Sequence, residues 1–230
     1  MTAVADGRQE TMTSCVVVFS GGQDSTTCLF WARARFDRVL AINFHYGQRH
    51  AVECEAARAI CESVAVPLVE ADLRVLGQLS RSALTRDDIP VAESGGMHGL
   101  PSTFTPGRNL VFLTLAASYA LSNDCSALVT GVCETDFSGY PDCRRNTVDA
   151  VEQAVRLGND APDFAVLTPL MHLSKKETVE LATTLSGCLD ALALSVTCYR
   201  GERPGCGTCP ACVLRAKGFA EAGIPDPARV

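Results

Sequence analysis

The clearest chemistry in the sequence lies in Ser-Gly-Gly-Gln-Asp-Ser at residues 20–25, between an apolar run at 15–19 and the apolar residues of a helix. A Gly-Gly turn between a strand and a helix brings backbone N–H groups close to a ligand. The first helical turn adds unpaired donors and the positive end of the helix dipole. Ser20, Ser25 and Thr26 add hydroxyl groups. The pattern predicts a phosphate-binding loop. It is not a Walker loop, because no lysine follows the glycines.

A second group of chemically active residues lies near the C-terminus: Cys198, Cys206, Cys209 and Cys212. Four thiolates at this spacing can close a tetrahedral Zn²⁺ site, and the glycines and proline between them allow tight turns. Because four thiolates leave no position for water, the metal would be structural. An iron–sulfur cluster would use the same residue types. A zinc ribbon that binds nucleic acid is disfavoured, because few basic residues surround the cluster in an acidic chain.

The loop at residues 133–143 combines carboxylates, hydroxyls and an aromatic ring. A solvated turn would also be polar. The combination is nevertheless typical of a pocket that binds a polar heterocycle. Its candidate substrate-binding residues are Glu134, Asp136, Tyr140 and Asp142.

Ser-Lys-Lys-Glu at residues 174–177 is a capping box, which predicts the start of a helix that continues to about residue 186. Lys175 and Lys176 oppose the dipole at this position. Either both point into solvent, or one of them faces a bound phosphate.

These residues need a scaffold, and the apolar pattern supplies one. Short apolar runs predict strands at 15–19, 39–44, 67–71, 126–132 and 164–167, and helical patterns occupy 27–35, 50–65, 107–122 and 147–157. This alternation predicts an α/β fold with a parallel sheet and right-handed crossovers. Ligands of such sheets bind beyond the carboxyl ends of the strands, where the Ser-Gly-Gly loop and residues 133–143 would lie.

Composition narrows the function classes. The chain has 230 residues, 47% of them hydrophobic, which suits one α/β domain with a small appendage. A net charge of −6 argues against a broad nucleic-acid-binding face. The apolar run at 110–121 is shorter than the ~20 residues that span a bilayer. Residues 1–14 form a polar tail without the apolar run of a signal peptide, so we expect a cytoplasmic protein. Its twelve cysteines are then thiols and metal ligands rather than disulfides.

The motifs together resemble the 7-cyano-7-deazaguanine synthase family of the ATP-pyrophosphatase (PP-loop) superfamily, from about residue 15 to residue 219. The strings that carry the resemblance are FSGGQDSTTCL at 19–29, YGQRH at 46–50, LTRDDIP at 84–90, TPGRN at 105–109, TGVCETDFSGYPDCR at 130–144, TPLMHLSK at 168–175, and TCYRG with CGTCPACVLRAKGF within 197–219.

The resemblance implies a Rossmann-like, adenine nucleotide α-hydrolase-like fold with a five-stranded, mostly parallel sheet. Residues 15–190 would form the ATP-binding domain, with a lid loop at 80–107. Residues 191–222 would form a small zinc-binding helical knuckle. The lid assignment also follows from composition, since four glycines and three prolines exclude regular structure across residues 80–107.

The family's reaction would make this chain an ATP-dependent C–N ligase. It would convert 7-carboxy-7-deazaguanine and ammonia to the nitrile through an acyl adenylate and an amide, with ATP, Mg²⁺ and Zn²⁺ as cofactors. The resemblance assigns ATP binding to Phe19, Ser20, Gly21, Gly22, Gln23, Asp24, Ser25, Thr26, Thr27, Cys28 and Leu29. It assigns catalysis to Asp24, Ser25, Arg108 and Lys175, with Asp24 helping to hold Mg²⁺. A homodimer that binds neither membrane nor nucleic acid is also implied.

The chain departs from the family after residue 144, where an acidic pair and an apolar residue are replaced by Arg145, Asn146 and Thr147. The change places positive charge beside the proposed substrate loop. One alternative is therefore a diverged relative that stops at the amide, or couples the acyl group to an amine of a partner protein. A zinc-ribbon binding module with a degenerate nucleotide loop is a third reading, and the intact loop at 20–25 argues against it.

Overall fold

The computed structural model describes residues 13–48, 52–91, 97–135 and 139–229. Its centre is a parallel sheet with strand order β3-β2-β1-β4-β5. The strands are β1 (Ser14–Val18), β2 (Arg38–His45), β3 (Leu68–Asp72), β4 (Ala127–Val129) and β5 (Ala165–Leu167). The predicted five-stranded α/β fold is confirmed, and every strand pair of this sheet is parallel.

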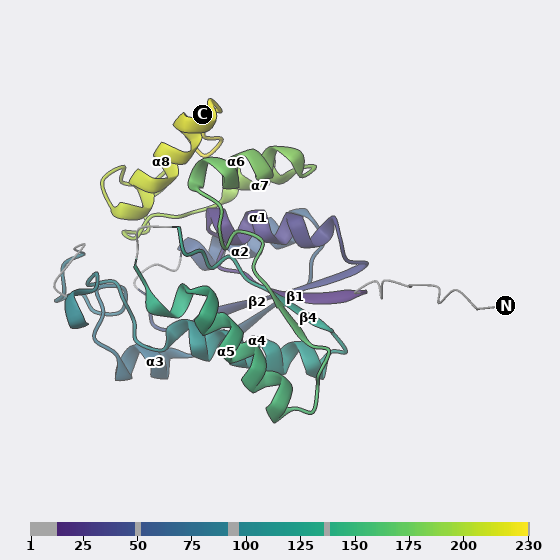
Figure 1. Cartoon of the computed structure of the whole chain (residues 1–230). Coiled ribbons are helices and arrows are strands. Elements are labelled where there is room, and N and C mark those ends of the chain that lie inside the picture. Colours follow the sequence, from purple (N-terminus) through teal and green to yellow (C-terminus); the bar gives the residue numbers. More distant parts are fainter. Residues whose placement is uncertain (1–12, 49–51, 92–96, 136–138, 230) are drawn as a thin grey trace.

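Helices cover both faces of the sheet (Figure 1). One face carries α1 (Gln23–Arg33), α2 (Val52–Ser63), α6 (Lys175–Thr184), α7 (Cys188–Leu194) and α8 (Pro210–Ala222). The other carries α4 (Arg108–Ser122) and α5 (Arg145–Gly158). The short helix α3 (Arg74–Leu79) follows β3, and single 3-10 turns occur at Met97–Gly99 and Pro141–Cys143.

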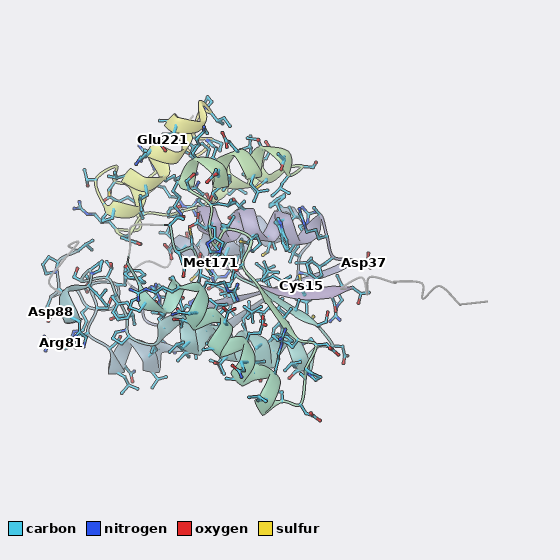
Figure 2. The ribbon with its side chains drawn as sticks, viewed as in Figure 1. Cys15, Asp37, Arg81, Asp88, Met171 and Glu221 are labelled. Carbon is cyan, nitrogen blue, oxygen red and sulfur yellow. The ribbon has the colours of Figure 1, made fainter. Side chains whose placement is uncertain are left out.

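Two apolar cores result from the alternation of side chains along the strands. Val17 and Val129 pack toward α1 and α6, while Val16 and Leu128 pack toward α4 and α5. Side chains fill the space between the layers. The labelled Cys15 and Met171 lie in the interior, whereas charged residues such as Asp37 and Glu221 lie at the surface (Figure 2).

Several local predictions need correction. The helix expected to open on residues 24–26 begins at Gln23, so the phosphate loop runs directly into its first turn. Helices α3 and α7 were not predicted, whereas α8 lies within the helical knuckle expected at residues 191–222. Ser14 begins β1 rather than ending a tail, and residues 1–12 of that expected tail lie outside the described part of the chain. The capping box is confirmed, because Ser174 Oγ accepts from the Glu177 N–H and the Glu177 carboxylate accepts from the Ser174 N–H.

The described parts of the expected lid pack into the protein. Ser82, Ala83 and Thr103 are buried, and the Ala83 N–H donates to the Ser102 carbonyl over 2.8 Å. The two ends of the segment are therefore hydrogen-bonded to each other. Closure of this segment over a ligand stays a prediction. Within the described ranges, no helix is long and apolar enough to cross a membrane.

Candidate active site

The phosphate loop turns tightly against α2. Gly21 has a φ of +83°, and a Cβ at this position would lie 2.6 Å from the Glu53 carbonyl oxygen and 2.7 Å from the Ala57 nitrogen. A side chain therefore has neither the space nor the backbone conformation here. The Ser20 and Ser25 hydroxyls lie 3.1 Å apart, and Ser25 Oγ lies 3.1 Å from the Gly22 carbonyl oxygen, to which it donates. These contacts make the loop a compact turn that directly follows the carboxyl end of β1.

Lys175 faces this loop and not solvent. Its Nζ lies 2.6 Å from Asp24 Oδ2, and the two side chains are 13% and 29% exposed. Lys176 instead pairs with Glu180 at the surface. Among the described residues, Asp24 Oδ1 is buried and has no hydrogen-bond partner. A buried carboxylate oxygen of this kind suits Mg²⁺, which proteins bind through one or two carboxylates together with substrate phosphates.

Helix α8 fixes the start of α6. A Cβ at Gly218 would lie 2.8 Å from Lys175 Cβ and 3.0 Å from the Lys175 carbonyl oxygen. The backbone of α8 therefore touches the residue that carries the amine, and only glycine permits this approach.

A cavity of about 300 Å³ opens beside the loop. Asp24, Ser25 and Lys175 lie on its wall, together with the carboxyl ends of β1 and β2. Much of the remaining wall is aromatic: Phe44, Tyr46, Phe112, Tyr140 and Tyr199. The Phe44 and Phe112 rings stack with centroids 4.5 Å apart. Such a wall suits a flat heterocycle adjacent to a phosphate site.

Arg108 enters the same cavity between two tyrosine rings. Its guanidinium carbon lies 5.6 Å from the Tyr46 ring centroid and 5.9 Å from that of Tyr140. Burial acts to lower the pKa of Arg108, but Tyr46, Tyr140 and Asp142 raise it above its usual range, so the group stays cationic. Its predicted role in countering phosphate charge stays a prediction.

Glu53 also lines the cavity, and the sequence reasoning missed it. It lies in the first turn of α2. Burial raises its pKa to about 7, and Arg108 acts in the opposite direction. Acidic residues are common in the first turn of a helix, so the residue type alone does not mark Glu53 as a site residue. Its place in the helix that follows the carboxyl end of β2 could have marked it as a candidate.

Of the predicted substrate residues that the structure describes, one lines the cavity and two do not. Tyr140 lines the cavity, and its hydroxyl is hydrogen-bonded to that of Thr103. Asp142 accepts from the Asn109 N–H over 3.1 Å, and Glu134 accepts from the Arg145 N–H. Neither of these carboxylates lines the cavity. Asp136 lies outside the described residues. Substrate binding by these four residues therefore stays a prediction.

Only part of the predicted ATP-binding stretch lines the cavity. Phe19, Ser20, Gly22 and Gln23 line the cavity alongside Asp24 and Ser25. Gly21 forms the turn itself. Thr26, Thr27, Cys28 and Leu29 are buried residues of α1, away from the lining. We infer that these last four support the loop from behind.

Arg145 and Asn146 lie at the start of α5 and do not line the cavity. The Arg145 guanidinium pairs with Asp149 and donates to the Thr168 hydroxyl over 2.8 Å. The expected positive mouth is therefore largely neutralised by an acid one turn along the same helix.

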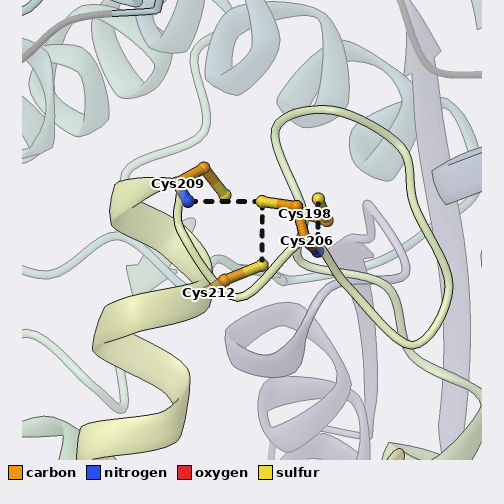
Figure 3. A group of neighbouring side chains, drawn as sticks. All are labelled: Cys198, Cys206, Cys209 and Cys212. Atoms are coloured by element: carbon orange, nitrogen blue, oxygen red, sulfur yellow. Dashed lines mark hydrogen bonds between the residues drawn. The ribbon is translucent and has the colours of Figure 1, made fainter.

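The four C-terminal cysteines converge where a loop meets the start of α8 (Figure 3). Their sulfur atoms all lie within 4.8 Å of one another. Tetrahedral Zn²⁺ with ~2.3 Å bonds to sulfur requires sulfur–sulfur distances of about 3.8 Å, close to the 3.9 Å between Cys206 and Cys212. The Cys209 N–H donates to Cys206 Sγ over 3.2 Å, which favours a thiolate. The donor set fits the predicted structural zinc.

A buried arginine connects the C-terminal region to the phosphate loop. Arg215 lies 2.8 Å from both carboxylate oxygens of Asp226 and donates to the Ser195 and Thr197 hydroxyls. The Thr197 hydroxyl in turn accepts from the Gln23 N–H over 3.3 Å. This chain of contacts supports the loop from the side of α8, and sequence spacing gave no indication of it.

Comparison with known proteins shows which family this chain resembles. Residues 14–223 match the model of a family described as queuosine biosynthesis protein QueC. A 7-cyano-7-deazaguanine synthase from Chromobacterium violaceum is 54% identical over 92% of this chain and 91% of its own length. The enzyme of the same name from Laribacter hongkongensis is 54% identical over 92% of both chains. A solved structure of a predicted subunit of tRNA methyltransferase from Methanocaldococcus jannaschii is 17% identical over 74% of each chain, with a TM-score of 0.48.

Proposed function

The chain belongs to the queuosine biosynthesis protein QueC family, and from this premise we propose that it converts 7-carboxy-7-deazaguanine and ammonia to 7-cyano-7-deazaguanine, with cleavage of ATP to AMP and pyrophosphate. One observation carries the proposal furthest. A single cavity has the phosphate loop and the Asp24–Lys175 pair on one wall and aromatic rings on another. It could hold a nucleotide phosphate and a flat heterocycle against each other.

The chemistry requires activation of a poor electrophile. A carboxylate oxygen of the substrate attacks the α-phosphorus of ATP, and pyrophosphate leaves. Ammonia attacks the resulting acyl adenylate, and AMP leaves with formation of the amide and release of a proton. The amide oxygen then attacks the α-phosphorus of a second ATP, and a second pyrophosphate leaves. Loss of AMP and of the nitrogen-bound protons gives the nitrile.

In these steps the protein positions the reacting groups and neutralises phosphate charge. These are the main contributions of protein groups to phosphoryl and nucleotidyl transfer. The loop N–H groups bind the departing pyrophosphate. Lys175, held by Asp24, counters its negative charge. Bound Mg²⁺ would neutralise further phosphate charge and would be held by Asp24. The four-cysteine zinc would act on the fold, because it has no open coordination position.

Mass spectrometry of the products tests the proposal. The purified protein is incubated with 7-carboxy-7-deazaguanine, excess ATP, Mg²⁺ and ammonia as the only amine. We expect the nitrile, with two AMP formed per nitrile. Amide that accumulates with no nitrile would support the diverged relative. No AMP above a control without the deazaguanine would contradict both.

Nothing in the described part of the chain favours the diverged relative. Arg145, which motivated it, lies outside the cavity lining and is paired with Asp149. A cytoplasmic homodimer with small-molecule substrates and no nucleic-acid partner is part of our proposal, supported by the family and the acidic composition. Light scattering measures the oligomeric state directly.

A further inference from the structure

The proposed substrate presents a demanding edge to the protein. A guanine-like ring carries a carbonyl oxygen, a ring N–H and an exocyclic amine side by side. A matching protein surface must therefore offer one donor next to two acceptors. A carboxylate supplies both acceptors in one group, and an arginine supplies the donor. The carboxylates predicted from the sequence to do this include Glu134 and Asp142, whose oxygens accept backbone N–H groups and which do not themselves line the cavity.

Among the described residues that line the cavity, the carboxylates are Asp24 and Glu53. Asp24 is paired with Lys175 at the phosphate loop. Glu53 instead shares the cavity with Arg108, which interacts with it electrostatically. Arg108 lies against the Tyr46 and Tyr140 rings. An acceptor and a donor thus occupy the aromatic part of the cavity together.

We propose that Glu53 determines specificity for the deazaguanine ring, its two carboxylate oxygens accepting from the ring N–H and the exocyclic amine, while Arg108 donates to the adjacent ring carbonyl. This assignment rests on the proposed function. The ring would lie among Tyr46, Tyr140 and Tyr199, which line the cavity around the pair.

The energetics of Glu53 agree with this role. Burial raises its pKa to about 7, because the partly buried carboxylate is less well solvated when charged than it would be in water. Two N–H donors from a ligand would replace the missing water. Adenine is a poorer match, because its corresponding edge presents an amine beside a ring nitrogen acceptor, which would face a carboxylate oxygen.

Steady-state kinetics of Glu53→Gln test the proposal when combined with a substrate analogue that lacks the exocyclic amine. With the natural substrate, the variant should raise KM for the deazaguanine roughly 10- to 100-fold, the usual effect of a lost bidentate base contact. KM for ATP should stay within about threefold, since Glu53 is assigned no contact with ATP. For the wild type, the analogue should show a similar rise in KM.

The variant and the analogue remove the same contact, so their effects should not multiply. For the Glu53→Gln variant, replacing the natural substrate with the analogue should therefore raise KM by less than about threefold. Glu55→Gln is the matched control, because Glu55 is an exposed acid in the same helical turn. Glu53→Asp, which keeps the charge but shortens its reach, provides a second variant and should fall between wild type and Glu53→Gln.

The proposal would be overturned by effects of variant and analogue that multiply in full, or by a Glu53→Gln defect confined to KM for ATP. An active wild type whose Glu53→Gln variant keeps its KM for the deazaguanine would also overturn it, while leaving the proposed function intact. A wild type that forms no AMP with the carboxy-deazaguanine would instead contradict the proposed function.

Discussion

Glu53→Gln should stabilise the ligand-free protein at alkaline pH. The pKa of Glu53 rises from 4.5 to about 7 in the folded state, chiefly through burial. Because one pKa unit corresponds to about 1.4 kcal/mol, keeping this carboxylate ionised in the folded protein costs up to about 3 kcal/mol at pH 8. Glutamine has the same shape and no charge, so it removes this cost. Its amide still needs hydrogen bonds, which makes the figure an upper bound.

The direction in which stability changes with pH follows from proton binding to Glu53. Below pH 4.5 the group is protonated in both states and costs nothing. Between pH 4.5 and 7 the folded state binds the proton more tightly than the unfolded state, so stability falls as pH rises. Above pH 7 the loss is complete. Relative to wild type, the variant should therefore gain up to about 2 kcal/mol more at pH 8 than at pH 5.

Urea unfolding of the ligand-free proteins at pH 5 and pH 8 measures this difference. Comparing the variant with wild type at each pH cancels the titration of other groups to first order. Glu55→Gln, at an exposed position of the same helix, should show little pH-dependent gain. If the gain from Glu53→Gln is the same at both pH values, or is larger at pH 5, the burial argument is refuted.

The remaining predictions concern the loop, the metal and the family departure. Asp24→Asn should lower the rate of AMP formation by about 100-fold or more with an unchanged circular dichroism spectrum, because it weakens the placement of Lys175 and of Mg²⁺; AMP release at the normal rate would remove that role. Cys209→Ser should reduce zinc from about one ion per chain and lower thermal stability, as measured by atomic absorption and calorimetry; full zinc content would show that Cys209 is dispensable. Arg145→Asp with Asn146→Glu should leave the nitrile as product, since neither residue lines the cavity; chromatography that shows a new balance of amide and nitrile would contradict this.

The sequence predicted the sheet well because its central strands β1, β2 and β4 are largely buried apolar runs, each placed between helices and turn residues. The phosphate loop was predictable for a related reason: its chemistry lies in contiguous residues, and backbone geometry alone places it at the sheet edge. The cysteine cluster was predictable because metal-ligand spacing within 198–212 is itself a local signal.

Glu53 and Arg215 could not be predicted in this way, because their environment is created by segments far apart in sequence. Glu53 meets Arg108 only after α2 and α4 pack on opposite sides of the carboxyl edge of the sheet. Glu134 and Asp142 are the converse case, and substrate binding by them stays a prediction. Their composition suggested a ligand site, but their oxygens satisfy backbone N–H groups at the starts of α5 and α4. Local polarity does not distinguish a ligand-binding carboxylate from one that supports a helix start.

The close approach of Gly218 to Lys175 links the four-cysteine region to the phosphate loop. Helix α8 begins within the cysteine cluster and two turns later touches the backbone that presents the lysine amine. A tetrahedral metal that never meets substrate would therefore set the direction of a catalytic side chain. In a zinc-starved cell, the enzyme would lose turnover through a misplaced amine before it lost its sheet, and cysteine variants would share a phenotype with lysine variants. Measuring nitrile formation and strand amide exchange side by side during chelation would reveal whether the two losses separate.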